Sequence, residues 1–396
     1  MIDLSFLQTE AQALLPEIIQ IRRHIHAHPE LSFQETETMR FIASVLEKEG
    51  ISFKSGVGNT GIVAEICGTN PESRLIALRS DHDALPILEK NEIEFASKNK
   101  GVMHACGHDV HTACLLGAAK ILNNHKDKFQ GKVRLIFQPG EEKLPGGATL
   151  MIAEGVLKNP VPDFIVGLHV FPELEVGKVG FKSGMYMAST DELYLKVIGK
   201  GGHAALPEQY NNPLLIAAAI IQELNNKFMV ANSELNPEKI PTVLAFGKIT
   251  GAGATNVIPD FVNLEGTFRT MNEEWRKKAH EVLIQTANSI AKSMGGSVEF
   301  TIEKGYPFLV NDPTTTEKIR SVATDLLGKE NVTELKLRMT AEDFAWYSQE
   351  IPSCFFRLGT RNESKGIVSP VHTATFDVDE DALRIGMMLM AGAVFA

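Results

Sequence analysis

The sequence has few cysteines and no long hydrophobic run. Its 396 residues include four cysteines, at positions 67, 106, 114 and 354, which are too few and too scattered for a disulfide framework. No apolar stretch approaches the roughly 18 residues that a membrane span requires. The amino terminus carries acidic residues where a secretory signal needs a basic region. We therefore expect a soluble cytoplasmic protein with no membrane partner, and we expect Cys67, Cys114 and Cys354 to be core residues.

Basic charge is also scarce. The 39 lysine and arginine residues are outnumbered by 49 aspartate and glutamate residues, which makes the formal net charge −10. Binding of nucleic-acid phosphates requires a clustered basic face, and the basic residues of this chain are dispersed. The sequence thus predicts no nucleic-acid partner. Its 44% hydrophobic and 22% charged residues are typical of a globular protein, and its length predicts two or three domains.

The densest group of potential metal ligands lies between His104 and Thr112. The run His-Ala-Cys-Gly-His-Asp-Val-His-Thr holds three imidazoles, a thiol and a carboxylate. Cys106 and His108 are two residues apart, so their side chains can point the same way on an extended or loop backbone. A thiolate combined with imidazole suits zinc, cobalt, nickel or manganese better than magnesium or calcium. The run therefore predicts a transition-metal site.

Apolar runs alternate with a helical pattern between Val63 and His169. Strands are predicted over 74–79, 132–138 and 164–169, and a helix over 111–123. Strands that are apolar on both faces are typical of a sheet covered by helices. Polar residues end each run, namely Asp81-His-Asp83, Gln138-Pro-Gly-Glu-Glu142 and His169. Because ligand sites in α/β sheets lie at the carboxyl ends of strands, we expect these side chains to gather there.

A different rhythm follows Gly184. Strands are predicted over 192–199, 242–250, 261–269 and 297–304, with helices over 213–228 and 275–293. This β-α-β-β-α-β order is that of the ferredoxin-like unit. The remaining segment returns to apolar strands and helices. We therefore predict an α/β protein in which 1–184 and 309–396 form a metal-binding domain on a helix-covered mixed sheet, and 185–308 form an inserted ferredoxin-like α+β domain.

Two adjacent carboxylates, Glu141 and Glu142, follow the strand that is predicted over 132–138. Neighbouring side chains on an extended turn point in different directions, so one can bind a metal while the other accepts a proton from a metal-activated water. Taken alone, such a pair is more often two solvated loop residues. His169 and His372 could likewise be structural histidines. Together with Cys106 and His108, however, Glu142 and the two histidines make five ligand-type residues, enough for two metals.

The chain resembles the dinuclear metallohydrolases of the aminoacylase and carboxypeptidase G type. The resemblance is strongest to the branch that contains hippurate hydrolase, N-acyl-amino-acid amidohydrolases, N-acetyldiaminopimelate deacetylase and plant auxin-conjugate hydrolases. It rests on motifs in matching order and spacing: Arg22–Glu30, Ser80–Pro86, His104–Thr112, Phe137–Glu142, Gly167–His169, Gly199–Pro207, Thr255–Pro259, Gly266–Arg269, Thr340–Phe344 and His372.

This resemblance implies the roles of nine residues. Two divalent ions (zinc, manganese, cobalt or nickel) would be held by Cys106, His108, Glu142, His169 and His372, with Glu141 as general base. His203 would stabilise the oxyanion, often across a homodimer formed through the inserted domain, although a plain loop histidine also fits its glycine-rich segment. Asn256 and Arg269 would contact substrate. An arginine can bind a carboxylate with two parallel hydrogen bonds, and it can equally be a surface residue.

Several other motif residues depart from or support this pattern. His104, Asp109 and His111 are expected to support the metal ligands. His82 stands where the family usually has methionine, and it either lies near the metals or replaces methionine packing. Residues 339–341, Met-Thr-Ala, replace the usual Met-Gly-Ser. If the insert supplies substrate contacts, its closure as a lid would complete the site.

We therefore predict a metal-dependent amidohydrolase that cleaves the amide bond of small N-acyl amino acids of the N-acetyl or N-benzoyl type. One alternative is a dipeptidase or carboxypeptidase of the same family. Another is a non-catalytic metal-binding homologue, which Glu141 and His203 disfavour because a pure binder needs neither. A thiol-based redox protein is disfavoured because the chain has no Cys-x-x-Cys pair.

Overall fold

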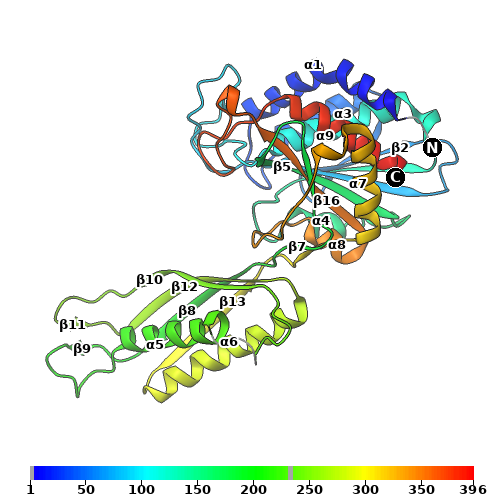
Figure 1. Ribbon diagram of the computed structural model, residues 1–396. Helices are drawn as coiled ribbons and strands as arrows, with labels where there is room; N and C mark the ends of the chain where they lie inside the picture. Colours follow the sequence, from blue (N-terminus) through cyan, green and yellow to red (C-terminus); the bar gives the residue numbers. More distant parts are fainter. Residues whose placement is uncertain (1–3, 231–234) are drawn as a thin grey trace. The chain divides into compact units, whose positions relative to one another are not determined.

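A computed structural model describes residues 4–230 and 235–396 (Figure 1). The chain forms two compact units. Unit 1 contains residues 1–184, 310–336 and 343–396, and unit 2 contains 185–309 and 337–342. The short segment 337–342 was predicted to belong with the carboxyl-terminal part of the chain, but it groups with unit 2, where the main-chain N–H of Arg338 donates to the carbonyl of Tyr186.

Unit 1 is built on one mixed sheet of eight strands in the order β1-β2-β4-β3-β5-β16-β6-β15. Its central strands β4, β3, β5 and β16 run parallel. Every residue of β3 is buried, which is why its sequence shows no polar alternation. The strands are β1 (Ser52–Val57), β2 (Gly61–Cys67), β3 (Leu75–Asp81), β4 (Lys132–Gln138), β5 (Phe164–Glu175), β6 (Val179–Phe181), β15 (Val332–Glu334) and β16 (Ser353–Arg361).

Helices cover both faces of this sheet (Figure 1). On one side α1, α3 and α9 pack together; on the other, α4 and α8 lie against each other. Small residues allow α3 and α9 to approach closely, since a Cβ added to Gly386 would lie 2.3 Å from the sulfur of Cys114. The helices are α1 (Ser5–Ala27), α2 (Thr36–Lys48), α3 (His108–Asn124), α4 (Gly147–Ala153), α7 (Pro313–Leu327), α8 (Ala345–Glu350) and α9 (Asp381–Gly392).

Unit 2 is a four-stranded antiparallel sheet in the order β10-β12-β8-β13 that packs against two helices. Both helices begin at a side-chain cap: Asn212 accepts from the N–H of Leu214, and Asn272 accepts from that of Trp275. The elements are β8 (Asp191–Ile198), α5 (Pro213–Asn225), β10 (Thr242–Thr250), β12 (Phe261–Thr270), α6 (Glu273–Ser293) and β13 (Ser297–Lys304), with the short strands β9 (Gly202–His203) and β11 (Val257–Ile258) paired at one end. The chain enters unit 2 within β7 (Gly184–Met187) and leaves it within β14 (Leu309–Asn311).

The predicted fold class is confirmed, and two local predictions are wrong. The strand expected to end at His169 continues to Glu175, because β16 pairs with it as far as Phe171 and, after an irregularity, again at Glu175. Cys67, expected in the core, is exposed at the end of β2, whereas Cys114 and Cys354 are buried. In the described part of the chain, no helix is both long and apolar enough to cross a bilayer.

Candidate metal centre

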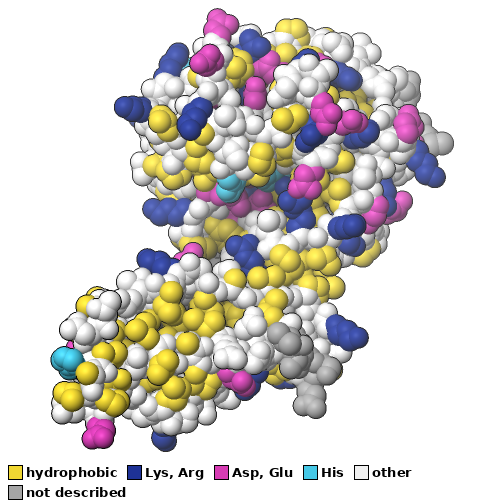
Figure 2. Space-filling model, turned by 60° about the vertical axis from the view of Figure 1, so that its left-hand side comes forward, with side chains coloured by type: hydrophobic (Ala, Val, Ile, Leu, Met, Phe, Trp, Pro, Cys, Tyr) yellow, Lys and Arg dark blue, Asp and Glu magenta, His cyan; other side chains and the backbone are white. Residues whose placement is uncertain are grey.

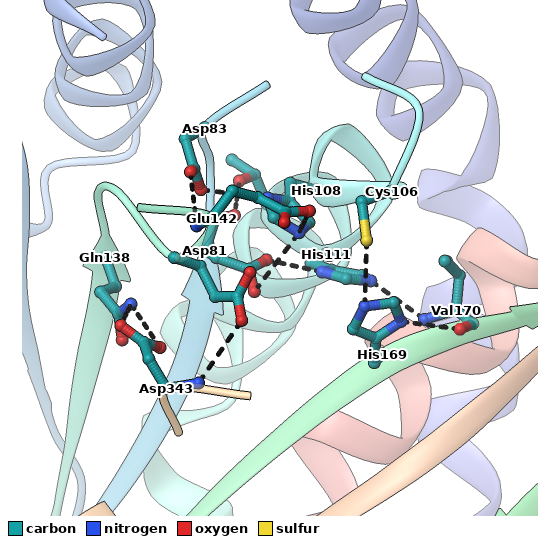
Figure 3. A network of polar contacts seen from close by, with 12 residues as sticks. Asp81, Asp83, Cys106, His108, His111, Gln138, Glu142, His169, Val170 and Asp343 are labelled. Carbon is teal, nitrogen blue, oxygen red and sulfur yellow. Dashed lines mark hydrogen bonds and ion pairs between the residues drawn. The ribbon is translucent and has the colours of Figure 1, made fainter. Parts of the chain in front are cut away.

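Polar side chains from β3, β4, β5 and the start of α3 converge in unit 1 (Figure 3). Asp81 is the last residue of β3 and Asp83 follows it, and Glu141 and Glu142 follow β4. His169 points from the middle of β5 rather than from its end. Cys106 lies just before α3, and His108 is the first residue of that helix. Between these two residues Gly107 has φ of 83°, and a Cβ there would lie 2.5 Å from Val170, so only glycine fits.

Cys106 belongs to two groups of potential ligands. Its Sγ lies 3.4 Å from Nε2 of His169 and 3.2 Å from Nε2 of His372. One group is Cys106 with His108 and His169, and the other is Cys106 with Glu142 and His372. Within each group the ligand atoms all lie within 4.8 Å of one another. A thiolate common to two such groups is suited to bridging two cations.

Hydrogen bonds determine which nitrogen of each histidine faces the thiol. Nδ1 of His169 lies 2.7 Å from the carbonyl oxygen of Val170, so this nitrogen carries the proton and Nε2 presents a lone pair. Nδ1 of His108 lies 3.1 Å from Asp83, and its Nε2 is buried with no hydrogen-bond partner among the described residues. A cation would satisfy such a buried lone pair. The residues therefore fit a metal centre.

The protonation of the cluster also supports a metal centre. Burial, reinforced by the charge of Glu142, raises the pKa of the Cys106 thiol. Hydrogen bonds to Cys106 and Glu142 raise the pKa of His372 to about 10. Without a cation, the cluster thus retains protons on its ligand atoms. Divalent ions bind such groups by displacing those protons.

His372 differs from the other four residues in its backbone and its exposure. Its φ is 62°, in the left-handed region that non-glycine residues rarely adopt. Its side chain is 52% exposed, whereas that of His108 is 1% exposed. Strained residues of this kind persist where the surrounding structure holds them, often at functional sites. The group containing His372 therefore opens to solvent, and the group containing His169 is enclosed.

The two adjacent glutamates have different partners. Oε1 of Glu142 lies 3.2 Å from Nε2 of His372, on the ligand side of the cluster. Glu141 is buried, and its Oε1 accepts a hydrogen bond of 3.4 Å from the main-chain N–H of Asp343. A carboxylate oxygen of Glu141 also lies within 4.8 Å of ligand atoms of His108 and Glu142. This position next to the ligands suits a residue that accepts a proton there.

Of the residues expected to support the ligands, two have clear contacts. Nδ1 of His111 donates to Asp81 over 2.6 Å, because its Nε2 accepts the N–H of Val170. Asp109 accepts from Arg22 of α1 and lies 2.8 Å from Nδ1 of His26, which ties the first turn of α3 to α1.

His82 and His104 are different from these two. Each is fully buried, and the described residues offer no hydrogen-bond partner to either ring nitrogen of either residue. Burial lowers the pKa of His82 to about 4 and that of His104 to about 3, so both rings are neutral. Neither is in a group of potential ligands within the described chain. His82 thus occupies a core position, as a methionine would.

The other three predicted site residues lie in unit 2, at two ends of its sheet. His203 is exposed in β9, which pairs with β11 next to Asn256. Nδ1 of His203 accepts the N–H of Ala205, so Nε2 carries the proton and can donate. Arg269 lies near the opposite end of β12, and donates to the carbonyl of Met339.

Two residues with central contacts had no role in the sequence analysis. Asp83 holds His108, and Asp343 contacts Glu141. Asp83 follows a buried strand together with Asp81, and that polar cluster was the available signal. Asp343 lies in the matched motif Thr340–Phe344, but no local pattern connects it to Glu141.

Comparison with known proteins is consistent with this geometry. A profile of the family described as "Peptidase family M20/M25/M40" matches residues 77–396. "Thermostable carboxypeptidase 2" of Saccharolobus solfataricus is 38% identical, over 97% of this chain and 96% of its own length. "N-acetyl-L-cysteine deacetylase" of Bacillus subtilis is 40% identical, over 93% and 85%. The crystal structure of the YXEP protein of Bacillus subtilis, described as a dinuclear metal binding peptidase from the M20 family, superposes with a TM-score of 0.83 at 35% identity, over 97% of this chain and 98% of that one.

Proposed function

We propose that this chain, which belongs to peptidase family M20/M25/M40, is a hydrolase that cleaves the amide bond of small N-acyl amino acids. One observation carries the proposal. Glu141 is a buried carboxylate beside two groups of metal ligands that share Cys106, and its Oε1 accepts a hydrogen bond from the main-chain N–H of Asp343. This is the arrangement that a general base next to an electrophilic centre requires.

Two divalent ions, zinc, manganese, cobalt or nickel, would be held by Cys106, His108, Glu142, His169 and His372. When bound, they supply Lewis acidity for a carbonyl oxygen at this position. The carboxylate of Glu141 takes a proton from the attacking water and returns it to the leaving amine. The protonated Nε2 of His203 donates a hydrogen bond to the oxyanion of the tetrahedral intermediate.

Arg269 and Asn256 would select the substrate. The guanidinium of Arg269 is half-buried and can bind the free carboxylate of an acylated amino acid through two parallel N–H donors. The relative named as a deacetylase supports an N-acyl substrate. The relative named as a carboxypeptidase favours a second candidate, in which an aminoacyl or peptidyl group takes the place of the acyl group. Both use the same chemistry at the amide carbon.

We also propose that the protein acts as a homodimer through unit 2. A strand rises about 3.3 Å per residue, so β12 alone places Arg269 roughly 26 Å from the end near His203 and Asn256. An acylated amino acid extends over about two residue lengths, or ~7 Å. A single unit 2 therefore cannot bring His203 and Arg269 to one substrate, whereas two copies can each supply one end.

The surface of unit 2 supports this assembly. Hydrophobic side chains gather over it in the space-filling view (Figure 2). Leu215 at the start of α5 is 62% exposed, and Ile249 in β10 is 54% exposed. Because β10 is an edge strand, its unpaired main-chain groups can pair with the same strand of a second copy.

The test is amine release from a panel of N-acetyl and N-benzoyl amino acids, with metal-loaded wild type, Glu141→Ala and Glu175→Ala. Glu175, an exposed residue at the end of β5, is the matched control. We expect Glu141→Ala to lose at least ~10²-fold in kcat at equal metal content, and Glu175→Ala to keep wild-type activity. Turnover of dipeptides alone would favour the peptidase candidate. Absence of both activities with two metals bound would favour a non-catalytic binder.

A further inference from the structure

Asp343, in the motif Thr340–Phe344, has no role of its own in the function proposed above, yet it lies at the centre of a buried network beside Glu141. We propose that Asp343 is a positioning residue that holds the carboxylate of Glu141 in place. This inference rests on the proposed role of Glu141 as general base. It assigns Asp343 no contact with substrate or metal.

The carboxylate of Asp343 is fixed on several sides. It is fully buried and accepts hydrogen bonds from Arg79 over 2.7 Å and from the main-chain N–H of Ala148 over 3.0 Å. Nε2 of Gln138 lies 2.9 and 2.8 Å from its two oxygens, and Figure 3 shows the two side chains facing each other. These donors come from β3, from α4 and from the end of β4. Donors from three elements thus restrain the Asp343 side chain.

The fixed position of Asp343 restrains Glu141 in two ways. The main-chain N–H of Asp343 donates to Oε1 of Glu141, so the position of the Asp343 backbone sets that of one carboxylate oxygen. Gln138, which binds the Asp343 side chain, is the last residue of β4 and precedes the loop that carries Glu141. Asp343 thus restrains both the carboxylate of Glu141 and the start of the loop that carries it. Misplacement of a catalytic group by about 1 Å can cost ~10²-fold in rate.

The network continues to the metal ligands. Arg79, which donates to Asp343, also donates to Asp81 over 2.7 Å. Asp81 in turn accepts from His111, whose Nε2 accepts the N–H of Val170, next to His169. A continuous chain of hydrogen bonds therefore runs from Glu141 to the strand that carries a metal ligand. Asp343 sets the position of the base relative to that ligand.

The charges make Asp343→Asn a usable variant. Arg79 is a fully buried cation that contacts the carboxylates of both Asp81 and Asp343. In Asp343→Asn the guanidinium of Arg79 keeps its ion pair with Asp81, so no buried charge is left unpaired. The amide, however, has only one acceptor oxygen, so it cannot accept from Arg79 on one side and from the main-chain N–H of Ala148 on the other as the carboxylate does, and the backbone at 343 shifts. Asp379→Asn is the matched control, because Asp379 is also a buried carboxylate of unit 1 and its side-chain partners are Asn362 and Lys365.

The decisive experiment is a double-mutant cycle in kcat and KM on the substrate that wild type cleaves best, at equal metal content. We expect Asp343→Asn to lower kcat by about 10- to 100-fold with KM nearly unchanged. In the Glu141→Ala background the same substitution should change kcat by less than about two-fold, since residues that act as a unit are not additive. Equal losses in both backgrounds would overturn the proposal, because Asp343 would then act independently of Glu141.

A structural readout keeps the test independent of activity. Crystal structures of wild type, Asp343→Asn and Asp379→Asn should show the Glu141 carboxylate displaced only in Asp343→Asn. An unmoved Glu141 in Asp343→Asn would overturn the positioning role. Different results reject the two hypotheses. If Glu141→Ala keeps full activity, Glu141 is not the general base. If Glu141→Ala is inactive and Asp343→Asn is fully active, only the positioning role of Asp343 is rejected.

Discussion

Nδ1 of His108 lies 3.1 Å from Oδ1 of Asp83, while the other oxygen of Asp83 accepts from Ser32 over 2.6 Å and from the main-chain N–H of Glu142 over 3.0 Å. One buried carboxylate thus orients the ring of one proposed ligand and the backbone of another. Burial disfavours the ionised form of Asp83, but the hydrogen bond and charge of His108 lower its pKa to about 2. The carboxylate is therefore ionised across the working range of most proteins.

Replacing Asp83 should weaken metal binding without removing a ligand atom. In Asp83→Ala the His108 ring loses its partner, and outer-sphere partners of this kind are worth about 10- to 100-fold in metal affinity. Ser32→Ala is the control, since it removes a hydrogen bond from Asp83 and leaves the contact to His108. Isothermal titration with zinc would measure both. Equal affinities in the two variants would contradict the prediction.

Cys106 and His372 should differ in their effect on metal content. Cys106 belongs to both groups of ligands, so Cys106→Ala should lower the content of both metals. His372 belongs to one group only and is exposed, so His372→Ala should lose about one metal of two and keep the enclosed one. Elemental analysis after dialysis against a mild chelator gives the ratio of metal to protein. Two metals retained in Cys106→Ala would exclude a bridging role for the thiol.

Unit 2 should lose stability in acid through Asp191. This buried carboxylate contacts Arg276 over 2.5 Å and His280 over 2.6 Å. Burial opposes its ionisation, but hydrogen bonds from His280 and Arg276 prevail and lower its pKa. A carboxylate with a lowered pKa stabilises the fold above its unfolded value of ~3.9, and this contribution is lost as the pH falls through the folded value.

The measurement for Asp191 is Tm against pH from 7 to 3, for wild type and Asp191→Asn. Wild type should lose Tm below about pH 4, and the variant should start lower and change less over this range. Glu265→Gln is the control, because Glu265 pairs with Lys248 on the surface of the same sheet. An equally steep acid loss in Asp191→Asn would assign the effect to other groups.

The dimer proposal predicts rescue between two inactive variants. Glu141→Ala lacks the base, and His203→Ala lacks the oxyanion donor. In a mixed dimer that shares sites, the unit 1 of one chain and the unit 2 of the other together form one intact site. Mixed and refolded proteins should therefore recover about a quarter of wild-type activity, the share of sites expected from random pairing. No recovery in confirmed mixed dimers would show that each chain uses its own His203.

Much of the fold could be predicted from local pattern. The bounds of β10 and β13 coincide with those predicted, and along β13 exposed and partly buried residues alternate in a pattern that is visible in the sequence. The extension of β5 to Glu175 could not be predicted in this way. It depends on pairing with β16, whose sequence lies far along the chain.

The proposed site likewise contains residues that local pattern could predict and residues that it could not. The five proposed ligands could be predicted because each has a strongly metal-binding side chain within a motif of the family that the chain resembles. The role of Asp343 depends on Arg79 and Gln138, and its partner Glu141 is 202 residues away. A buried aspartate of this kind looks like any polar loop residue in the sequence. Cys67 was misjudged for the opposite reason, because an apolar residue at a strand end is not necessarily enclosed.

The strand order of unit 1 has a consequence during synthesis. β16 is made after all of the contiguous part of unit 2, yet it occupies the space between β5 and β6 in the sheet. Translation proceeds at about 5–20 residues per second, so a ribosome-bound chain holds an incomplete sheet for many seconds while unit 2 can already fold. His372 emerges later still. A complete set of ligands thus exists only after both β16 and His372 have been made, and a chain truncated before β16 would expose the flank of β5 to quality-control proteases and chaperones.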